Sequence, residues 1–289
     1  MKPFAPHSPD TLWPLLVAAI RDFVDTRGFS GAFVSLSGGI DSAIVAALAV
    51  DALGSSRVFA ATYPSACTSN ETLADAIETA CRLGIPCPVV SIESACRLLT
   101  DLLPPPTAYA GAGLAEGAPV AENLQARIRG LLNMTLSNRH GLAVLCTGNR
   151  SEALTGYCTL YGDTCGAYAP LRDVYKTEVY ALAYHRNALA TGTPPIPAGI
   201  IARPPTAELR PGQKDTDNLP PYPLLDRILS ALADDPADPL PPDDDVARQA
   251  EASPAEVRRV RALLVGSAFK RLQAPPGPQL RPTPAVPEP

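Results

Sequence analysis

The sequence predicts an α/β fold: a doubly wound parallel sheet flanked by helices, followed by a helical C-terminal part and a proline-rich tail. Short apolar runs alternate with stretches of helical length over the first half of the chain, which is typical of parallel strands joined by crossover helices. At 289 residues the chain is long enough for one large α/β core with appendages, and no internal repeat is visible.

The expected elements follow from these patterns in chain order. Leu16, Ile20 and Phe23 fall on one face of a first helix, which Pro14 distinguishes from a secretory leader. A later run is rich in strong helix formers and ends at Gly54. The expected helices are 12–23, 42–53, 71–83 and 122–138, and the expected strands are 32–36, 58–63, 88–92 and 143–146.

Clusters among the 33 prolines indicate where regular structure stops. After prolines 104–106 comes a Gly/Ala-rich stretch, 107–119, which we expect to be a flexible surface loop. The last segment, 275–289, is dominated by proline, and we expect it to be disordered or extended. This leaves 1–274 as one domain.

Composition excludes several classes of protein. The net charge is −5 without a long basic run, which argues against a nucleic-acid partner. The seven cysteines are odd in number and form no C-x-x-C pair, so reduced thiols in a cytoplasmic protein are expected. Three histidines offer no plausible zinc site. No apolar run approaches the ~18 residues needed to span a bilayer, so we expect no membrane association.

The most informative stretch is L-S-G-G-I-D-S, residues 36–42, between the first expected strand and the alanine-rich helix. Strand, glycine turn and helix together point backbone N–H groups and a helix dipole at an anion. Gly38 and Gly39 let the backbone approach a phosphate without a Cβ in the way. The stretch is neither a Walker loop nor a G-x-G-x-x-G turn.

The polar residues of this stretch favour a phosphate site over a bare turn. Ser37 and Ser42 add hydroxyl donors. Asp41 would repel phosphates unless a cation lay between them, so we interpret it as a Mg²⁺ ligand. A glycine turn that binds nothing is the alternative.

A second polar loop, T-G-N-R-S-E, follows the strand expected at 143–146, and ligands of such sheets bind at the carboxyl ends of strands. Thr147 is a candidate for contacting a nucleotide, and Glu152 for a second carboxylate on the same Mg²⁺. Taken alone, this loop fits an ordinary helix cap just as well. Lys176, further along, either reaches phosphates or extends from a helix surface into solvent.

S-G-G-I-D-S matches at every fixed position the signature of the N-type ATP pyrophosphatases, which cleave ATP between the α and β phosphates and have the adenine nucleotide alpha hydrolase-like fold. More specifically, an ordered series of segments from about residue 31 to 276 resembles NAD synthetase. The series is S-L-S-G-G-I-D-S-A, E-N-L-Q-A-R-I-R-G, T-G-N-R-S-E, G-Y-C-T-L-Y-G-D, D-V-Y-K-T, R-P-P-T-A-E-L-R-P-G-Q, D-N-L-P-P-Y and A-F-K-R-L-Q-A-P-P.

The resemblance implies a ligase that amidates deamido-NAD. ATP adenylates the nicotinic acid carboxylate and releases pyrophosphate, and ammonia then displaces AMP to give NAD. An enzyme of this kind must hold both substrates, neutralise the polyphosphate with Mg²⁺ and exclude water from the adenylate.

The resemblance also implies roles for individual residues. Asp41 and Lys176 would be catalytic, with Lys176 stabilising charge on the departing pyrophosphate, and Asp41 and Glu152 would hold Mg²⁺. The ATP-binding set would be Ser35, Leu36, Ser37, Gly38, Gly39, Ile40, Asp41, Ser42, Thr147, Lys176 and Thr206, and the deamido-NAD-binding set would be Asn123, Arg127, Glu152 and Lys270. In the last set, Asn123 could instead be a helix cap, Arg127 a solvated helix residue and Lys270 a surface charge.

Two departures from the family pattern concern substrate and nitrogen source. Leu160 stands where stand-alone ammonia-dependent members often have a lysine, so the chain looks like the synthetase half of the glutamine-dependent branch. The nitrilase-like glutaminase domain of that branch is absent from this sequence, and we expect either free ammonia or a separate glutaminase as the source. Family members are dimers, and a homodimer is expected here.

Two other functions compete with this one. The first keeps the pyrophosphatase chemistry and amidates another nucleotide such as xanthylate, but it would not require the E-N-L-Q-A-R-I-R-G segment. The second is a catalytically silent nucleotide-binding module, which would have little reason to keep Asp41, Glu152 and Lys176 together.

Overall fold

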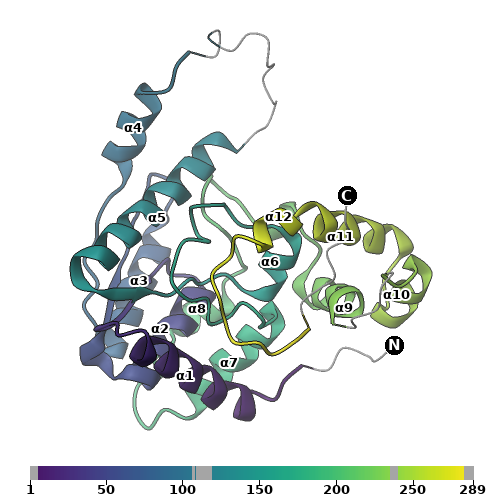
Figure 1. Cartoon of the computed structure of the whole chain (residues 1–289), viewed down its shortest axis with the longest axis horizontal. Coiled ribbons are helices and arrows are strands. Elements are labelled where there is room, and N and C mark those ends of the chain that lie inside the picture. Colours follow the sequence, from purple (N-terminus) through teal and green to yellow (C-terminus); the bar gives the residue numbers. More distant parts are fainter. Residues whose placement is uncertain (1–5, 106–107, 109–118, 235–239, 283–289) are drawn as a thin grey trace.

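The computed structural model describes residues 6–105, 108, 119–234 and 240–282 (Figure 1). Its strands are β1 (Gly31–Ser35), β2 (Val58–Ala61) and β3 (Leu142–Val144). Its α-helices are α1 (Pro9–Thr26), α2 (Ile40–Leu53), α3 (Asn70–Leu83), α4 (Glu93–Asp101), α5 (Val120–His140), α6 (Arg150–Thr155), α7 (Lys176–Ala188), α8 (Ala198–Ala202), α9 (Tyr222–Ala233), α10 (Asp243–Ala250), α11 (Pro254–Gly266) and α12 (Ala268–Arg271). Short 3₁₀ turns are η1 (Ser55–Arg57) and η3 (Asp215–Asp217).

The sheet is parallel, and within the described residues its strand order is β2-β1-β3. Alternate residues of the central strand point to opposite faces, as the pleat requires. Ala32 and Val34 join the apolar core formed with α1, α2 and α7, whereas Phe33 joins a separate core that includes Ile128 of α5. Helices therefore cover both faces of the sheet, which confirms the predicted doubly wound class.

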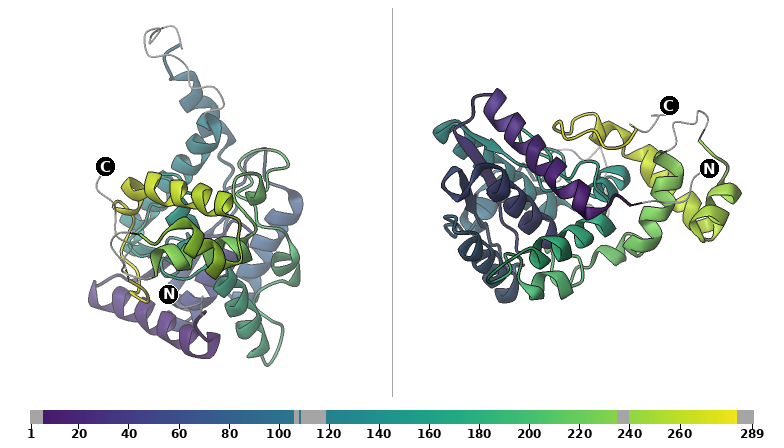
Figure 2. Two further views of the ribbon diagram at one scale, coloured as in Figure 1. Left: turned by 90° about the vertical axis from the view of Figure 1, so that its right-hand side faces the viewer. Right: turned by 90° about the horizontal axis from the view of Figure 1, so that it is seen from below.

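The C-terminal part is helical, as expected. Helices α9, α10 and α11 bury Leu225, Leu229, Val246 and Val260 in a third core, which also takes in Leu154 of α6. In Figure 1 this part lies beside the α/β body, with α6 close to α11 and α12. The other end of the molecule is drawn out into α4 and the start of α5, which project away from the body (Figures 1 and 2).

Three of the four expected strands are confirmed, with bounds that shift by no more than two residues. The strand expected at 88–92 is wrong, because this segment makes only an isolated bridge between Thr62 and Val89. It still runs beside β2, with carbonyls of Pro86 and Pro88 accepting N–H bonds from Ala60 and Thr62. The two prolines lack the N–H groups that a continuous ladder needs.

Of the two expectations for the tail, disorder or an extended course, residues 275–282 have the extended course. The carbonyl of Pro276 accepts the N–H of Ala169 at 2.8 Å, and Arg281 is 8% exposed and bonded to the body. The backbone there is extended and irregular, so its many prolines are compatible with an ordered course. Residues 283–289 lie outside the described part of the chain.

Two further expectations, on the loop 107–119 and on membrane spans, can be checked only where the structure describes the chain. The surface loop expected at 107–119 falls almost entirely outside them. Among the helices that the structure does describe, none is long and apolar enough to cross a membrane.

Candidate active site

The loop between β1 and α2 closes on itself through its two serines. The Ser42 hydroxyl donates to the carbonyl of Gly39 at 3.0 Å and accepts the backbone N–H of Ser37 at 3.2 Å. The Ser37 hydroxyl lies 3.0 Å from that of Ser42 and accepts the N–H of Gly39 at 3.2 Å. The serines thus shape the turn, and α2 begins immediately after it at Ile40.

Gly38 is the residue that permits this turn. Its φ is +80°, in the left-handed region that other residues avoid. A Cβ at Gly38 would also collide with the backbone carbonyl of Thr72 in α3. The carbonyl of Gly38 in turn accepts a bond of 3.4 Å from Arg203, which is paired with Asp75 of α3.

Beside this loop, a buried lysine joins two carboxylates. Lys176, the first residue of α7, is only 3% exposed and forms an ion pair with Asp41. Its Nζ is 3.4 Å from Oε1 of Glu152, in the first turn of α6. Asp41 also accepts a bond of 3.0 Å from the side-chain amide of Asn149, the N-cap of α6. Three elements that are distant in sequence therefore meet at one charged group.

Burial and mutual charge shift the pKa values of this group. Burial alone would lower the pKa of Lys176, but the charges of Asp41 and Glu152 outweigh it and raise that pKa above its ordinary value. Burial raises the pKa of Glu152, and the Asp41 charge adds to this against the lowering effect of Lys176. The lysine is therefore firmly charged, as a group that faces phosphates must be.

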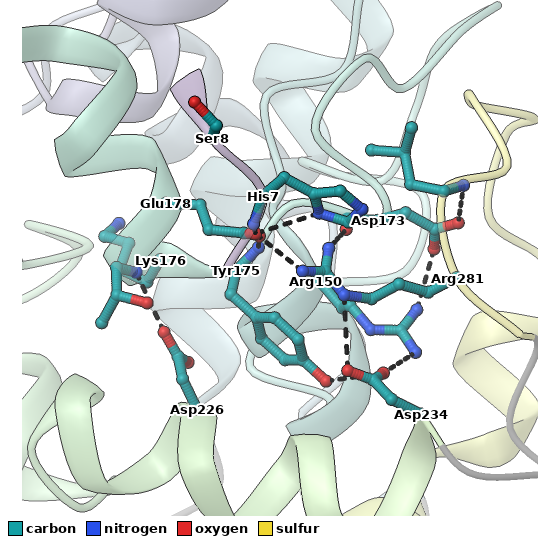
Figure 3. Close-up of polar contacts among 12 residues, drawn as sticks. His7, Ser8, Arg150, Asp173, Tyr175, Lys176, Glu178, Asp226, Asp234 and Arg281 are labelled. Atoms are coloured by element: carbon teal, nitrogen blue, oxygen red, sulfur yellow. Dashed lines mark hydrogen bonds and ion pairs between the residues drawn. The ribbon is translucent and has the colours of Figure 1, made fainter. Parts of the chain in front are cut away.

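Buried polar groups fix the first turn of α7, where Lys176 lies. Its backbone N–H donates to the Ser151 hydroxyl at 3.0 Å, and the next N–H, that of Thr177, donates to Asp226 of α9 at 2.9 Å. Asp226 also accepts the Ser151 hydroxyl at 2.5 Å. Figure 3 shows Asp226 approaching the start of α7 from α9. The first turn of α7 is thus capped by side chains from α6 and α9.

The glycine turn and the charged group of Asp41, Glu152 and Lys176 line a cavity of about 270 Å³ at the carboxyl ends of the strands. That is the position at which ligands bind to open parallel sheets. The structure places the following predicted residues on its wall: Ser35, Leu36, Ser37, Gly38, Gly39, Ile40, Asp41, Ser42, Thr147, Glu152, Lys176 and Thr206. Every residue that the sequence predicted to bind ATP or metal is among them.

The other three predicted substrate residues are not among those that line the cavity, and they bond to the segment 156–165. The Thr159 hydroxyl donates to the side-chain oxygen of Asn123 at 2.8 Å, and Nε of Arg127 donates to the Leu160 carbonyl at 3.2 Å. Nζ of Lys270 donates to the carbonyls of Gly156 and Cys158, both at 2.7 Å. All three therefore contact one segment, which itself lines the cavity at several positions.

Sequence reasoning missed several groups on the cavity wall. They include Arg129, whose guanidinium donates to the Tyr63 carbonyl, and Arg203 beneath the glycine turn. Asp163 and Asp215 are two further carboxylates there, and Asp215 accepts the hydroxyl of Tyr222 at 2.8 Å. Arg203 and Asp163 stand inside segments already matched to the family, which was the one available signal. Nothing in the sequence around Asp215 singles it out.

The donor set suits a magnesium ion that shares its coordination with phosphates. Asp41 and Glu152 both direct an oxygen at the same cationic group, the ammonium of Lys176. Across the described residues, no group of three or more His, Cys, Asp or Glu side chains forms a site that could hold a metal alone. Two carboxylates with the remaining ligands from phosphate and water is the arrangement that Mg²⁺ favours.

Known proteins match this chain over nearly its whole length. The profile of the NAD synthase family matches residues 12–274. The chain is similar to the glutamine-dependent NAD(+) synthetase of Acinetobacter baylyi, with 48% identity over 78% of this chain and 40% of that protein. The chain spans about half the length, or less, of the curated relatives that it matches.

Two solved structures resemble the chain over almost their full length. One is an NMN synthetase from Francisella tularensis, with 25% identity, a TM-score of 0.72 and coverage of 92% of this chain and 96% of that one. The other is an NH3-dependent NAD synthetase from Campylobacter jejuni, with 25% identity, a TM-score of 0.68 and coverage of 91% and 96%. On the extent of the profile match, the chain belongs to the NAD synthase family.

Proposed function

We propose that this chain uses ATP to amidate deamido-NAD, with ammonia as the nitrogen donor. The observation that carries the proposal is that Asp41, Glu152 and Lys176 meet on the wall of the same cavity that the serine–glycine turn lines. A polyphosphate needs both parts, because the turn offers N–H and hydroxyl donors and the charged group offers a buried cation.

The proposed reaction has two steps. A carboxylate oxygen of deamido-NAD attacks the α-phosphorus of ATP, the bond to the α–β bridging oxygen breaks, and pyrophosphate leaves. Ammonia then attacks the acyl carbon, AMP leaves with the former carboxylate oxygen that joined the acyl carbon to the α-phosphorus, and the surplus proton passes to solvent. Lys176 stabilises the charge that grows on pyrophosphate, and Ser37, Ser42 and the turn hold it in place. Asp41 and Glu152 would hold Mg²⁺, which would neutralise phosphate charge.

The acceptor side of the cavity is assigned to the segment 156–165. This segment is bonded by Asn123, Arg127 and Lys270. We propose that these three residues affect deamido-NAD binding by positioning the segment. Glu152 faces the substrate from α6. Thr147 and Thr206 line the cavity further along and are assigned to the nucleotide. A cytoplasmic location, a homodimer and a separate glutaminase stay predictions.

The identity of the acceptor is the main alternative, because one similar structure is named an NMN synthetase. An enzyme of that kind would take the mononucleotide acid in place of deamido-NAD, with the same adenylation chemistry. A second alternative is an enzyme that amidates xanthylate by the same chemistry. A third alternative is a silent module that binds ATP without cleaving it.

The test is a comparison of acceptors and nitrogen donors. Purified protein is incubated with ATP and Mg²⁺ and with deamido-NAD, nicotinic acid mononucleotide or xanthylate, each with ammonium or with glutamine, and AMP and the amide are measured. We expect AMP and NAD from deamido-NAD with ammonium. Preferential turnover of either other acceptor would reassign the substrate, and ATP binding without AMP in any sample would contradict the proposal.

A further inference from the structure

We propose that Arg281, in the extended C-terminal segment, is a positioning residue that holds Lys176 in the cavity. The inference rests on the role of Lys176 in the proposed function. Arg281 lies beyond residues 12–274, over which the chain matches its family. Its guanidinium is nevertheless one of the most buried charges of the structure, at 8% exposed.

Arg281 makes three polar contacts around the start of α7 (Figure 3). Nη2 donates to Oε1 of Glu178 at 2.6 Å, Nη1 donates to the backbone carbonyl of Asp173 at 2.5 Å, and Nε is 3.3 Å from Oδ2 of Asp234 at the end of α9. The N–H of Leu280 adds a bond of 3.1 Å to the Asp173 carboxylate. The segment is therefore fixed by backbone and side chain together.

Tyr175, the residue immediately before Lys176, has two guanidinium groups close to its ring. Arg281 lies 4.7 Å from the centroid of its ring, and Arg150 of α6 lies 5.4 Å from the same centroid. The Tyr175 hydroxyl donates to Asp234 at 2.9 Å, and its backbone N–H donates to Oε2 of Glu178 at 2.9 Å. Tyr175 is fully buried, so its ring can leave this place only if the surrounding groups move.

The same network reaches the other side of the active site. Arg150 forms ion pairs with Asp173 and Asp234 and stands two residues before Glu152. Its guanidinium also donates to the carbonyl of Pro282 at 3.3 Å. The C-terminal segment thus joins the first turns of α6 and α7, which carry the two partners Glu152 and Lys176.

The buried charges need the C-terminal arginine. Glu178, Asp173 and Asp234 face Arg150 and Arg281, with His7 of the N-terminal segment 3.1 Å from Glu178. Without Arg281, the buried Glu178 would lose its guanidinium partner and be left with hydrogen bonds from His7 and from the N–H of Tyr175, which is costly. We expect the first turn of α7 to relax toward solvent and to take Lys176 out of line with Asp41 and Glu152.

The experiment measures the position of the turn and the chemistry separately. Hydrogen–deuterium exchange of the peptide that spans 174–179 is compared in the full wild-type chain, in Arg281→Ala and in Arg281→Lys, all without substrate. Arg261→Ala is the matched control, because Arg261 pairs with Asp243 at 2.7 Å in the helical C-terminal part, away from Lys176. Turnover with ATP, deamido-NAD and ammonium is measured on the same samples.

For Arg281→Ala we expect exchange in 174–179 to become about tenfold faster, with β1 peptides unchanged. We expect kcat to fall about tenfold while KM for ATP changes less than about twofold. Arg281→Lys should lie between, because an ammonium cannot make all three contacts at once. Arg261→Ala should lower the melting temperature and leave both the 174–179 exchange and kcat unchanged.

Unchanged exchange in 174–179 of Arg281→Ala would overturn the inference, as would a fall in kcat of equal size in Arg261→Ala. If Arg281→Ala does not fold, Arg281→Lys decides in its place, and wild-type exchange in that variant overturns the inference. If wild-type protein forms no amide from any acceptor, the proposed function fails, and the exchange data alone decide whether Arg281 holds the turn.

Discussion

The two walls of the cavity are built in different ways. The β1–α2 wall is mainly local: the bonds that join Ser37, Gly39 and Ser42 span no more than five positions, although Arg203 also donates to the Gly38 carbonyl. The α6–α7 wall is assembled from distant parts of the chain. Lys176 and Asp41 are 135 positions apart, Ser151 and Asp226 are 75 apart, and Arg281 and Glu178 are 103 apart.

This difference shows which physical effect each wall depends on. The local wall depends on backbone geometry, since a glycine at φ +80° and two serines make the turn whatever the rest of the fold contributes. The distant wall depends on buried charge, since its side chains have little water around them and must satisfy one another. Mutations in the two walls should therefore fail in different ways.

The largest effect is expected where the walls meet, at Asp41. Asp41→Asn keeps the size of the side chain but removes the charge that pairs with Lys176, so we expect adenylation to fall ~100-fold or more. The fold should persist, because asparagine keeps the size of the side chain and one of its two acceptor oxygens, to which Asn149 or Lys176 can still donate. Pyrophosphate release measures the rate, and circular dichroism measures the fold.

The control for Asp41 is Asp244→Asn, a change of the same chemistry at an exposed position in α10. It should leave pyrophosphate release at the wild-type rate. If Asp41→Asn also kept its rate within about twofold, the assignment of Asp41 to the metal and to Lys176 would be wrong.

The next effect concerns Asp226, which belongs only to the distant wall. Burial raises the pKa of Asp226 from an ordinary value of 3.8 to about 6. Between these pH values the folded chain binds a proton that the unfolded chain has released, so stability from this group rises as pH falls. The slope is about 1.4 kcal/mol per pH unit, or about 3 kcal/mol over the whole interval.

Chemical denaturation of wild type and Asp226→Asn at several pH values between about 4 and 7 tests this sign. Other titrating groups, such as Asp163, act in both proteins and largely cancel in the difference. We expect the unfolding free energy of wild type minus that of Asp226→Asn to grow on acidification. A difference that stays flat with pH would show that Asp226 does not titrate in this range.

The same division decides how much could be predicted from the sequence. The local wall was predictable residue by residue, because strand, turn and helix follow from neighbours in the chain. Thr147, Glu152 and Lys176 were predictable only through the family resemblance, since each also fits a cap or a surface charge. For the C-terminal segment, composition left disorder and an extended course open, because the partner that orders Arg281, Glu178, lies 103 positions away.

The local wall offers a matched pair of glycines. Gly38 and Gly54 both have φ +80°, but a Cβ at Gly54 meets nothing within 4 Å, whereas one at Gly38 collides with the Thr72 carbonyl. Gly54 also has ψ 151°, a backbone conformation essentially confined to glycine, so Gly54→Ala should cost the backbone strain alone, about 1–3 kcal/mol of unfolding free energy, and leave ATP binding intact. Gly38→Ala should cost more and weaken ATP binding.

Thermal or urea unfolding and calorimetric titration with ATP measure the two quantities. Equal losses of stability in the two variants would mean that the Thr72 carbonyl can move aside. ATP affinity reduced by Gly54→Ala would mean that α2 transmits strain from its C-terminal end to the turn.

The smallest effect separates the capping of a helix from the placing of a catalytic group. Asn149 and Ser253 each begin a helix with a capping box, Asn149 with Glu152 in α6 and Ser253 with Glu256 in α11. Replacing either by alanine should cost about 1 kcal/mol of stability, with the buried Asn149 at the upper end. Only Asn149 also donates to Asp41, at 3.0 Å.

We therefore expect Asn149→Ala to slow adenylation about tenfold and Ser253→Ala to leave it unchanged, although both lower the melting temperature. Because the two caps share their geometry, any difference in rate between the variants comes from the bond to Asp41. Equal rates in both variants would mean that Lys176 alone orients Asp41, and that the distant wall acts through charge without help from the α6 cap.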